Sequence, residues 1–205
     1  MTKKKKASRV VTAEQVAARK PGEKPEAQLD SHNLYKGKIF QLDRDHVRFP
    51  DGSEADMDIV RHPGASAIVP FMSDPEGENP QLLLLRQYRY AAGGYIYEVP
   101  AGRLDAGEAP ADCAVRELKE ETGCTADKME PLFTMFTTPG FTDEKIHVFM
   151  ATGLTRGETA KEADEFADVV IMPLAEALEL IRTGEIMDAK TALSILYAAG
   201  FRTGT

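Results

Sequence analysis

The chain has 205 residues, of which 42% are hydrophobic, and a formal net charge of −8, so it suits one domain with a core and short appendages. No apolar run approaches the roughly 18 residues of a membrane-spanning helix, and the four lysines at 3–6 are not followed by the apolar stretch of a secretory signal. Two cysteines offer no disulfide framework, so we expect a cytoplasmic protein without membrane contact.

Residues 1–32 come first and are predicted to be a basic, disordered tail, because they are polar and rich in Lys, Ala, Glu and Pro. Residues 1–30 hold eight Lys or Arg and four Asp or Glu, whereas the remainder holds 17 and 29. The acidic body argues against broad nucleic-acid binding, so nucleic acid is not the expected partner.

An N-terminal β region is predicted next, over residues 33–62, and the main domain over 63–205. Residues 35–49 alternate enough for a strand pair or one long strand, and 55–61 return as a strand after a turn at 50–53. In the main domain we predict strands at 65–71, 81–88, 95–99, 129–137, 145–151 and 169–172, loops at 74–80 and 153–164, and late amphipathic helices at 174–182 and 188–199.

Residues 102–124 predict a glycine-rich turn followed by one short helix. Pro110 suits the first helical turn, and Gly123 suits the left-handed position just past the end. Ala114 and Leu118 belong to an apolar face that packs on the core.

Three carboxylates border that apolar face. At about 100° per residue, Glu117 and Glu121 are neighbours one turn apart and Glu120 lies beside them. Their repulsion grows on desolvation, so a divalent cation with oxygen ligands, Mg²⁺ or alternatively Mn²⁺, is the expected reason for the arrangement. Arg116, one turn before Glu120, can orient that carboxylate from behind. The alternative is a solvated acidic helix with a salt bridge.

The same segment resembles the Nudix box, G-x5-E-x7-R-E-U-x-E-E-x-G-U, where U is apolar. The matching residues are Gly102, Glu108, Arg116, Glu117, Leu118, Glu120, Glu121 and Gly123, with Cys124 at the final apolar position. A free cysteine behaves as a small hydrophobe, so this departure is slight. The resemblance implies the Nudix α/β/α sandwich, an α/β (α+β) fold with a mixed sheet and a loop–helix–loop, and the predicted element order agrees with it.

Other stretches resemble the ADP-ribose pyrophosphatase subgroup of that family. Pro139 is the fifteenth residue after Cys124, where a proline marks the subgroup, although Thr138 stands where serine is usual. Similar stretches lie at 61–64, 87–89, 97–102 and 184–191, so the resemblance covers about 35–201. It implies Mg²⁺-dependent hydrolysis of a nucleoside diphosphate sugar, above all ADP-ribose to AMP and ribose 5-phosphate. It also implies a homodimer in which the N-terminal strands cross over.

The resemblance implies roles for single residues. The metal ligands would be Glu117, Glu120 and Glu121, joined by the backbone carbonyl of Ala101. Arg89 is the candidate for the diphosphate, because a guanidinium forks onto phosphate oxygens, and Glu98 for a ribose or a metal-bound water. From the residues alone, Arg89 is equally a surface arginine and Glu98 a strand residue facing water. The remaining substrate-binding candidates are Arg61, Pro139 and Glu144.

The resemblance implies a general base on a loop beyond the box. Glu162 and Glu165 both fit, and Glu165 is preferred because Glu-Phe shortly before the strand predicted at 169–172 resembles the subgroup more closely. Either one is otherwise an ordinary loop charge. The catalytic candidates are therefore Glu165, Glu162, Arg116 and Glu120.

Three other functions stay open. One is hydrolysis of GDP-mannose or another nucleoside diphosphate sugar. The second is a non-catalytic, nucleotide-binding Nudix-like regulator, against which the retained Glu117 and Glu121 argue. The third is an RNA 5′-end pyrophosphohydrolase aided by the basic tail.

Overall fold

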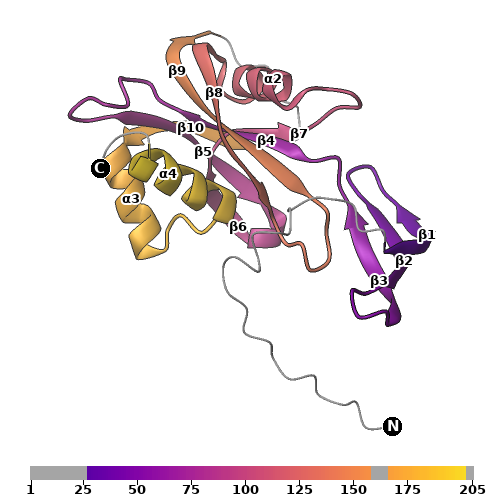
Figure 1. Cartoon of the computed structure of the whole chain (residues 1–205). Coiled ribbons are helices and arrows are strands. Elements are labelled where there is room, and N and C mark those ends of the chain that lie inside the picture. The colour runs from indigo at the N-terminus through magenta and orange to yellow at the C-terminus, as the bar shows by residue number, and fades with distance from the viewer. Residues whose placement is uncertain (1–26, 158–165, 202–205) are drawn as a thin grey trace.

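The computed structural model describes residues 27–157 and 166–201 (Figure 1). Most of the predicted tail lies outside the described residues. Strand β1 (Gln28–Lys36) begins within the predicted tail, so the boundary predicted at residue 32 lies too late. The reason is that β1 is exposed along its whole length. Its backbone pairs with a neighbouring strand without the apolar alternation that marks a half-buried one.

The described residues form ten strands, three α-helices and one short 3₁₀ helix, named as in Figure 1. After β1, the strands are β2 (Gln41–Arg48), β3 (Glu54–Arg61), β4 (Ala65–Pro70), β5 (Gln81–Arg89), β6 (Gly94–Glu98), β7 (Ala101–Arg103), β8 (Cys124–Phe136), β9 (Lys145–Arg156) and β10 (Ala167–Pro173). The helices are η1 (Tyr90–Ala92), α2 (Pro110–Thr122), α3 (Leu174–Thr183) and α4 (Ala189–Phe201). Each of them is too short to span a lipid bilayer.

The strands form three sheets with the orders β1-β2-β3, β10-β5-β6 and β7-β4-β9-β8. Strands β4 and β9 run parallel and every other named pair is antiparallel, which confirms the mixed sheet. The parallel pair joins segments about 80 positions apart, with Ala65 opposite Ile146. In the sequence, α2 and its flanking loops therefore come between two strands that are neighbours in space.

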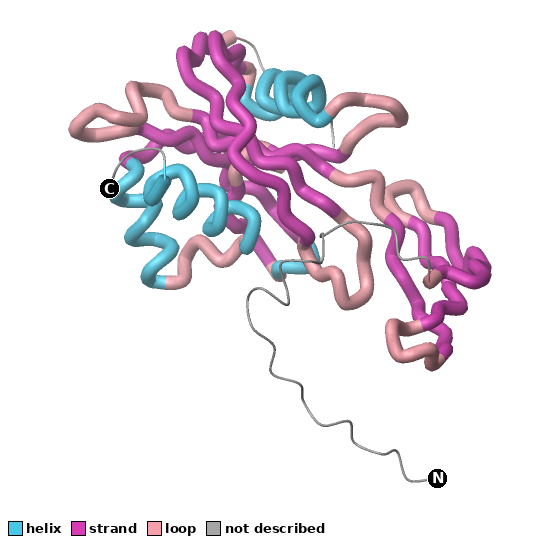
Figure 2. Tube along the Cα trace, viewed as in Figure 1, coloured by secondary structure: helices cyan, strands magenta, loops and turns pink. Residues whose placement is uncertain are grey.

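The body is a sandwich with α2 on one face and α3 and α4 on the other (Figure 2). The alternation within strands divides the core in two, because successive side chains point to opposite faces. In β4, Ile68 packs with Ala114 and Leu118 of α2, whereas Val69 packs toward α3 and α4 with residues such as Ala177 and Ile195. These layers confirm the α/β/α architecture.

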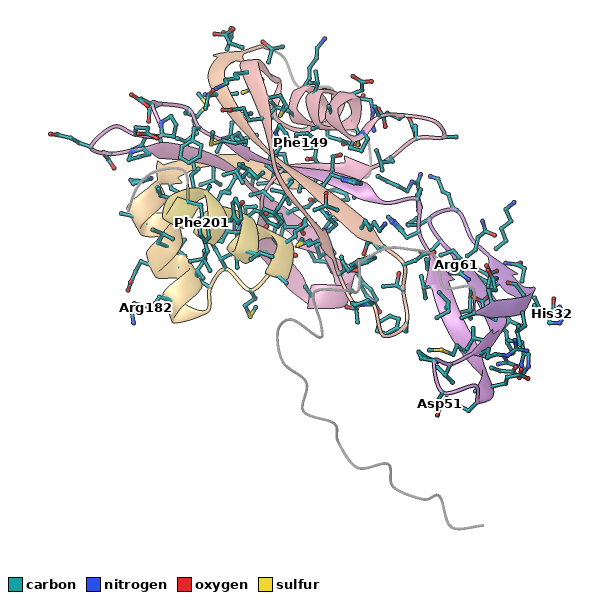
Figure 3. All side chains as sticks on the ribbon, viewed as in Figure 1. His32, Asp51, Arg61, Phe149, Arg182 and Phe201 are labelled. Carbon is teal, nitrogen blue, oxygen red and sulfur yellow. The ribbon has the colours of Figure 1, made fainter. Side chains whose placement is uncertain are left out.

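The three-stranded N-terminal sheet stands apart from that body (Figure 3). Arg61, at the end of β3, lies where this sheet meets the body (Figure 3). Several large apolar side chains of the sheet and its turns remain exposed, namely Leu29, Leu34, Tyr35, Ile39, Phe40 and Phe49. The described residues therefore leave this apolar surface without a cover.

Helices α2, α3 and α4 confirm the predicted helices within one or two residues. Two strand predictions were wrong at their ends, since β8 starts at Cys124 and β9 continues to Arg156 through part of the expected loop. The strand at Ala101–Arg103 was missed. Each miss comes from backbone pairing to a partner distant in sequence, which supports polar residues at a sheet edge without an apolar pattern.

Candidate active site

Helix α2 holds its carboxylates against the body through its two ends and its apolar face. It starts at Pro110, and Gly123 closes it with φ 72° and an N–H bond to the Lys119 carbonyl. Ala114 and Leu118 are buried, which fixes the rotation of the helix. Glu117 and Glu121 are consequently only 9% and 5% exposed, although both carry a carboxylate.

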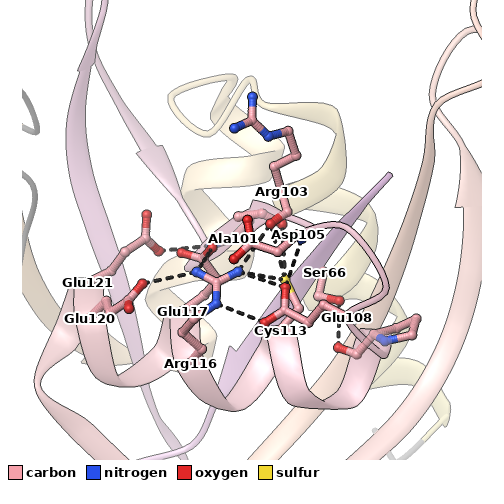
Figure 4. A network of polar contacts seen from close by, with 12 residues as sticks. Ser66, Ala101, Arg103, Asp105, Glu108, Cys113, Arg116, Glu117, Glu120 and Glu121 are labelled. Atoms are coloured by element: carbon pink, nitrogen blue, oxygen red, sulfur yellow. Dashed lines mark hydrogen bonds and ion pairs between the residues drawn. The ribbon is translucent and has the colours of Figure 1, made fainter. Parts of the chain in front are cut away.

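Arg116 is bonded to three of the carboxylates around it (Figure 4). Its Nε and Nη2 donate to the two oxygens of Glu108 at 2.9 and 3.0 Å, and its Nη1 donates to Glu117 at 2.6 Å and to Glu120 at 3.0 Å. A further bond from Nη2 reaches the Arg103 carbonyl at 3.1 Å. The Arg116 guanidinium and the Asp105 backbone N–H lower the pKa of Glu108 to about 2, so Glu108 is ionised at neutral pH.

The short strand β7 packs directly on the carboxylates of α2. The Ala101 N–H donates to Glu121 Oε2 at 2.9 Å. Gly102 lies so close that a Cβ built on it would stand 1.8 Å from Glu117 Oε1. The glycine is therefore required for the carboxylate to lie flat against the β7 backbone.

We call Glu108, Arg116, Glu117, Glu120 and Glu121 the box cluster. It sets four carboxylates against one guanidinium, an arrangement that costs free energy unless positive charge is added. The cleft beside it, of about 510 Å³, is lined by Glu117, Glu120, Glu121 and Ala101 and also by Arg89. Oxygen donors of this kind fit Mg²⁺ or Mn²⁺. As the described side chains stand, no three His, Cys, Asp or Glu residues converge on one ion position.

A second group of side chains, which we call the clamp cluster, consists of the charged residues Arg89, Glu98, Asp188 and Lys190 together with Thr191. Glu98 is only 3% exposed and accepts two bonds from Arg89, at 2.7 and 3.0 Å, and one from Lys190 at 2.5 Å. Burial alone would raise the pKa of Glu98, but the bonds and charges of Arg89 and Lys190 outweigh it and lower the pKa below its ordinary value. The alternative in which Glu98 is a strand residue facing water is therefore wrong.

Arg89 links the two clusters. Its pKa is raised chiefly by the hydrogen bond to Glu98, with smaller contributions from the charges of Glu121 and Asp188. The Arg89 side chain is 44% exposed and lines the cleft, while its guanidinium is bonded to Glu98. The alternative of a plain surface arginine does not describe this residue.

Three clefts follow one another across this side of the molecule. The cleft at the box cluster shares Arg89, Ala101, Gly102 and Arg103 with a second cleft of about 800 Å³. The second cleft shares His62 and Phe136 with a third of about 900 Å³ beneath the N-terminal sheet. Glu98 and Glu144 line the second cleft, and Arg61 and Pro139 line the third, so the sequence-predicted residues of the described chain lie along one continuous trough.

Arg61 is already engaged by three aspartates in that third cleft. It bonds Asp43 at 3.3 Å, Asp143 at 3.2 Å, and also the buried Asp45. The backbone of β3 adds to this link, because the Val60 N–H donates to the Phe141 carbonyl at 2.8 Å. Arg61 therefore ties the N-terminal sheet to the loop that carries Pro139 and Glu144.

Some residues of the site were missed by sequence reasoning, and others lie beyond the structure. Lys190, Asp188 and Thr191 were not assigned any role, although the stretch 184–191 was recognised as similar to the subgroup. Lys190 contacts Glu98, which is 92 positions away in the sequence, so local patterns could not show this contact. Glu162 and Glu165 lie outside the described residues.

Comparisons with known proteins agree with the site. The NUDIX domain model matches residues 62–191, and the chain therefore belongs to the Nudix family. An ADP-ribose pyrophosphatase from Bacillus subtilis is 38% identical over 84% of this chain and 91% of its own length. A methanol dehydrogenase activator from Bacillus methanolicus is 37% identical over the same shares. A solved structure described as an ADP compounds hydrolase shares the fold, with a TM-score of 0.73 and 22% identity over 86% of this chain and 94% of its own.

Proposed function

We propose that this protein hydrolyses the pyrophosphate bond of a nucleoside diphosphate sugar in a Mg²⁺-dependent reaction, with ADP-ribose as the main substrate and AMP and ribose 5-phosphate as products. The observation that carries the proposal is the box cluster, where four carboxylates face a cleft together with Arg89. The similarity to an ADP-ribose pyrophosphatase over most of both chains supports the choice of substrate.

The box cluster is proposed to hold the metal. Glu117, Glu120, Glu121 and the carbonyl of Ala101 supply oxygen ligands, and Arg116 orients the carboxylates from behind. When bound, Mg²⁺ neutralises pyrophosphate oxygens and lowers the pKa of an attacking water. The same role is open to Mn²⁺, which takes similar ligands.

The substrate is proposed to lie along the trough with its pyrophosphate at Arg89. The Nε and Nη2 of Arg89 are bonded to Glu98, which leaves its Nη1 without a hydrogen bond in the part of the chain described here. That donor is suited to a phosphate oxygen, and Glu98 thus acts by holding Arg89. Glu144 and Pro139 would contact the rest of the substrate, and Arg61 would hold their loop. Glu165, or alternatively Glu162, is proposed as the general base.

A homodimer that uses the N-terminal sheet is also proposed. The exposed apolar side chains of this sheet, including Leu34, Tyr35 and Phe40, would be covered by a second copy of the chain. Light scattering on the full-length protein would give twice the mass of one chain. A single-chain mass at micromolar concentration would contradict the dimer. Both cysteines are free and buried, which supports the proposal of a reducing, cytoplasmic setting.

The test is a substrate panel with purified protein and Mg²⁺. ADP-ribose, ADP-glucose, GDP-mannose, NADH and capped RNA would be compared for release of AMP, GMP or the capped nucleotide, with EDTA as the control. We expect ADP-ribose to give the highest kcat/KM and EDTA to abolish the reaction. Release of neither AMP nor GMP from any nucleotide sugar would contradict the proposal. Deletion of residues 1–26, which leaves β1 whole, separates the RNA alternative, because only RNA cleavage would need the basic tail.

A further inference from the structure

The first turn of α4 and the residue before it line the second cleft of the trough. Asp188 precedes the helix and caps it, because its Oδ2 accepts the Thr191 N–H at 3.0 Å and the Thr191 hydroxyl at 2.6 Å. The same oxygen accepts a bond from Lys190 Nζ at 2.8 Å. The cap therefore fixes the direction in which Lys190 leaves the helix.

Lys190 ends on the buried carboxylate of Glu98. Its Nζ bonds Glu98 Oε2, the oxygen that also accepts from Arg89 Nη2, while Glu98 Oε1 accepts from Arg89 Nε. The Lys190 side chain is 15% exposed, so this ion pair is poorly screened by water. With two carboxylates and two cations, the clamp cluster is balanced in charge, unlike the box cluster.

Thr191 attaches the same helical turn to the backbone next to Glu98. Its hydroxyl accepts the Val99 N–H at 2.9 Å while donating to Asp188, and Thr191 is completely buried. The strand end that carries Glu98 is therefore held through both its side chain and its backbone. A carboxylate restrained in this way can restrain the guanidinium that it binds.

We infer that Lys190 is a positioning residue, which fixes Glu98 and through it the guanidinium of Arg89 across the trough. The inference rests on the proposed function for its catalytic consequence, but its structural part concerns the ligand-free protein alone. Lys190 does not need to touch the substrate. Its effect should exist only while Arg89 is present to transmit it.

The structural part is tested by NMR on the ligand-free, full-length protein. The Nε–H signal of Arg89, assigned by its disappearance in Arg89→Met, should exchange slowly with water in the wild type because it is bonded to Glu98. Lys190→Met should speed this exchange by about tenfold or more, and Lys190→Arg, which keeps the charge, should restore the protection. Unchanged protection in a folded Lys190→Met protein would overturn the inference.

The catalytic part is tested by a double-mutant cycle on the hydrolysis of ADP-ribose with Mg²⁺. Lys190→Met should raise KM about tenfold and change kcat less, because Arg89 binds the pyrophosphate before and during reaction. In the Arg89→Met background the same substitution should have almost no further effect. An equal effect in both backgrounds would overturn the inference, since Lys190 would then act independently of Arg89.

Two controls separate positioning from loss of fold and from failure of the proposed function. Lys128→Met removes a lysine paired with Glu130 at 2.9 Å on β8, away from the trough, and should leave exchange and kinetics unchanged. Thermal unfolding of each variant reports the fold. If the wild type hydrolyses no nucleotide sugar, the proposed function fails, whereas the exchange of the Arg89 Nε–H still decides the positioning role.

Discussion

The box cluster and the clamp cluster both pair carboxylates with cations, but their charge balance differs. Among its own members, the box cluster sets four carboxylates against one guanidinium, and these members lie within 14 consecutive residues, 108–121. The clamp cluster sets Glu98 and Asp188 against Arg89 and Lys190, and its members are spread over the sequence from residue 89 to residue 191. The carboxylates of the clamp cluster are therefore neutralised by an equal number of cations, whereas those of the box cluster are not.

The difference separates binding from positioning. A cluster with excess negative charge is completed by a cation from solution, so its stability and activity should depend on the metal. A balanced cluster is complete without a ligand and is suited to hold one side chain in a fixed place. Arg89 interacts with both clusters, because it is hydrogen-bonded to Glu98 of the clamp cluster and the charge of Glu121 of the box cluster also raises its pKa.

The largest expected effect comes from a residue in neither cluster. All carboxylates of the box cluster are expected to bind metal or Arg116, so proton transfer should belong to the segment at 158–165. Glu165→Gln should lower kcat by about 10²–10⁴ at constant melting temperature, in line with general-base contributions. Glu162→Gln is the matched comparison, and unchanged kcat in both variants would place the base inside one of the clusters.

Removal of a carboxylate from the box cluster tests its need for a cation. Glu121→Gln should lower kcat by about 10² or more, beyond the roughly 10–100-fold typical of groups behind metal ligands. Mg²⁺ should raise the melting temperature of the wild type by mass action and raise that of the variant less. Calorimetry would detect an equal shift in both proteins, which would contradict a metal role for Glu121.

Gly102→Ala tests how closely β7 and Glu117 must approach. The added Cβ would overlap the Glu117 carboxylate, which is the mobile end of a side chain and can move aside. Metal affinity and kcat should therefore fall by about 10–100-fold, while the melting temperature changes little. Gly200→Ala, at a site with open space around it, is the control. Full activity of Gly102→Ala would show that Glu117 need not lie against β7.

The smallest effect concerns the pH dependence of stability at Glu108. Its pKa falls from 4.5 to about 2 on folding, so the bond to Arg116 stabilises the protein above pH 4.5 and is lost as pH falls toward 2. Glu108→Gln should lower the melting temperature at pH 7. The difference in melting temperature between wild type and variant should become smaller as the pH is lowered below 4.5. Melting curves with a constant difference down to pH 2 would exclude this pairing as the cause.

The sequence by itself determined the box cluster because its geometry is local. Helical spacing places Glu117, Glu120 and Glu121 together whatever the rest of the fold does, and Pro110 and Gly123 set the two ends of the helix. The family and the sandwich could be predicted because these residues resemble the Nudix box, and the resemblance implies both. The continuous apolar runs in β4 and β5 then supplied side chains to both halves of the core.

Only the tertiary structure decided which distant residues meet the box cluster. The spacing of residues 98 and 190 does not show that Lys190 binds Glu98. Nor does the sequence show that Arg61 donates hydrogen bonds to aspartates of two separate segments. Such contacts depend on how strands pair and helices pack over long sequence separations, which local periodicity does not encode. The sequence therefore defined the proposed metal-binding helix, and the packing of β5, β6 and α4 defined how Arg89 is held beside it.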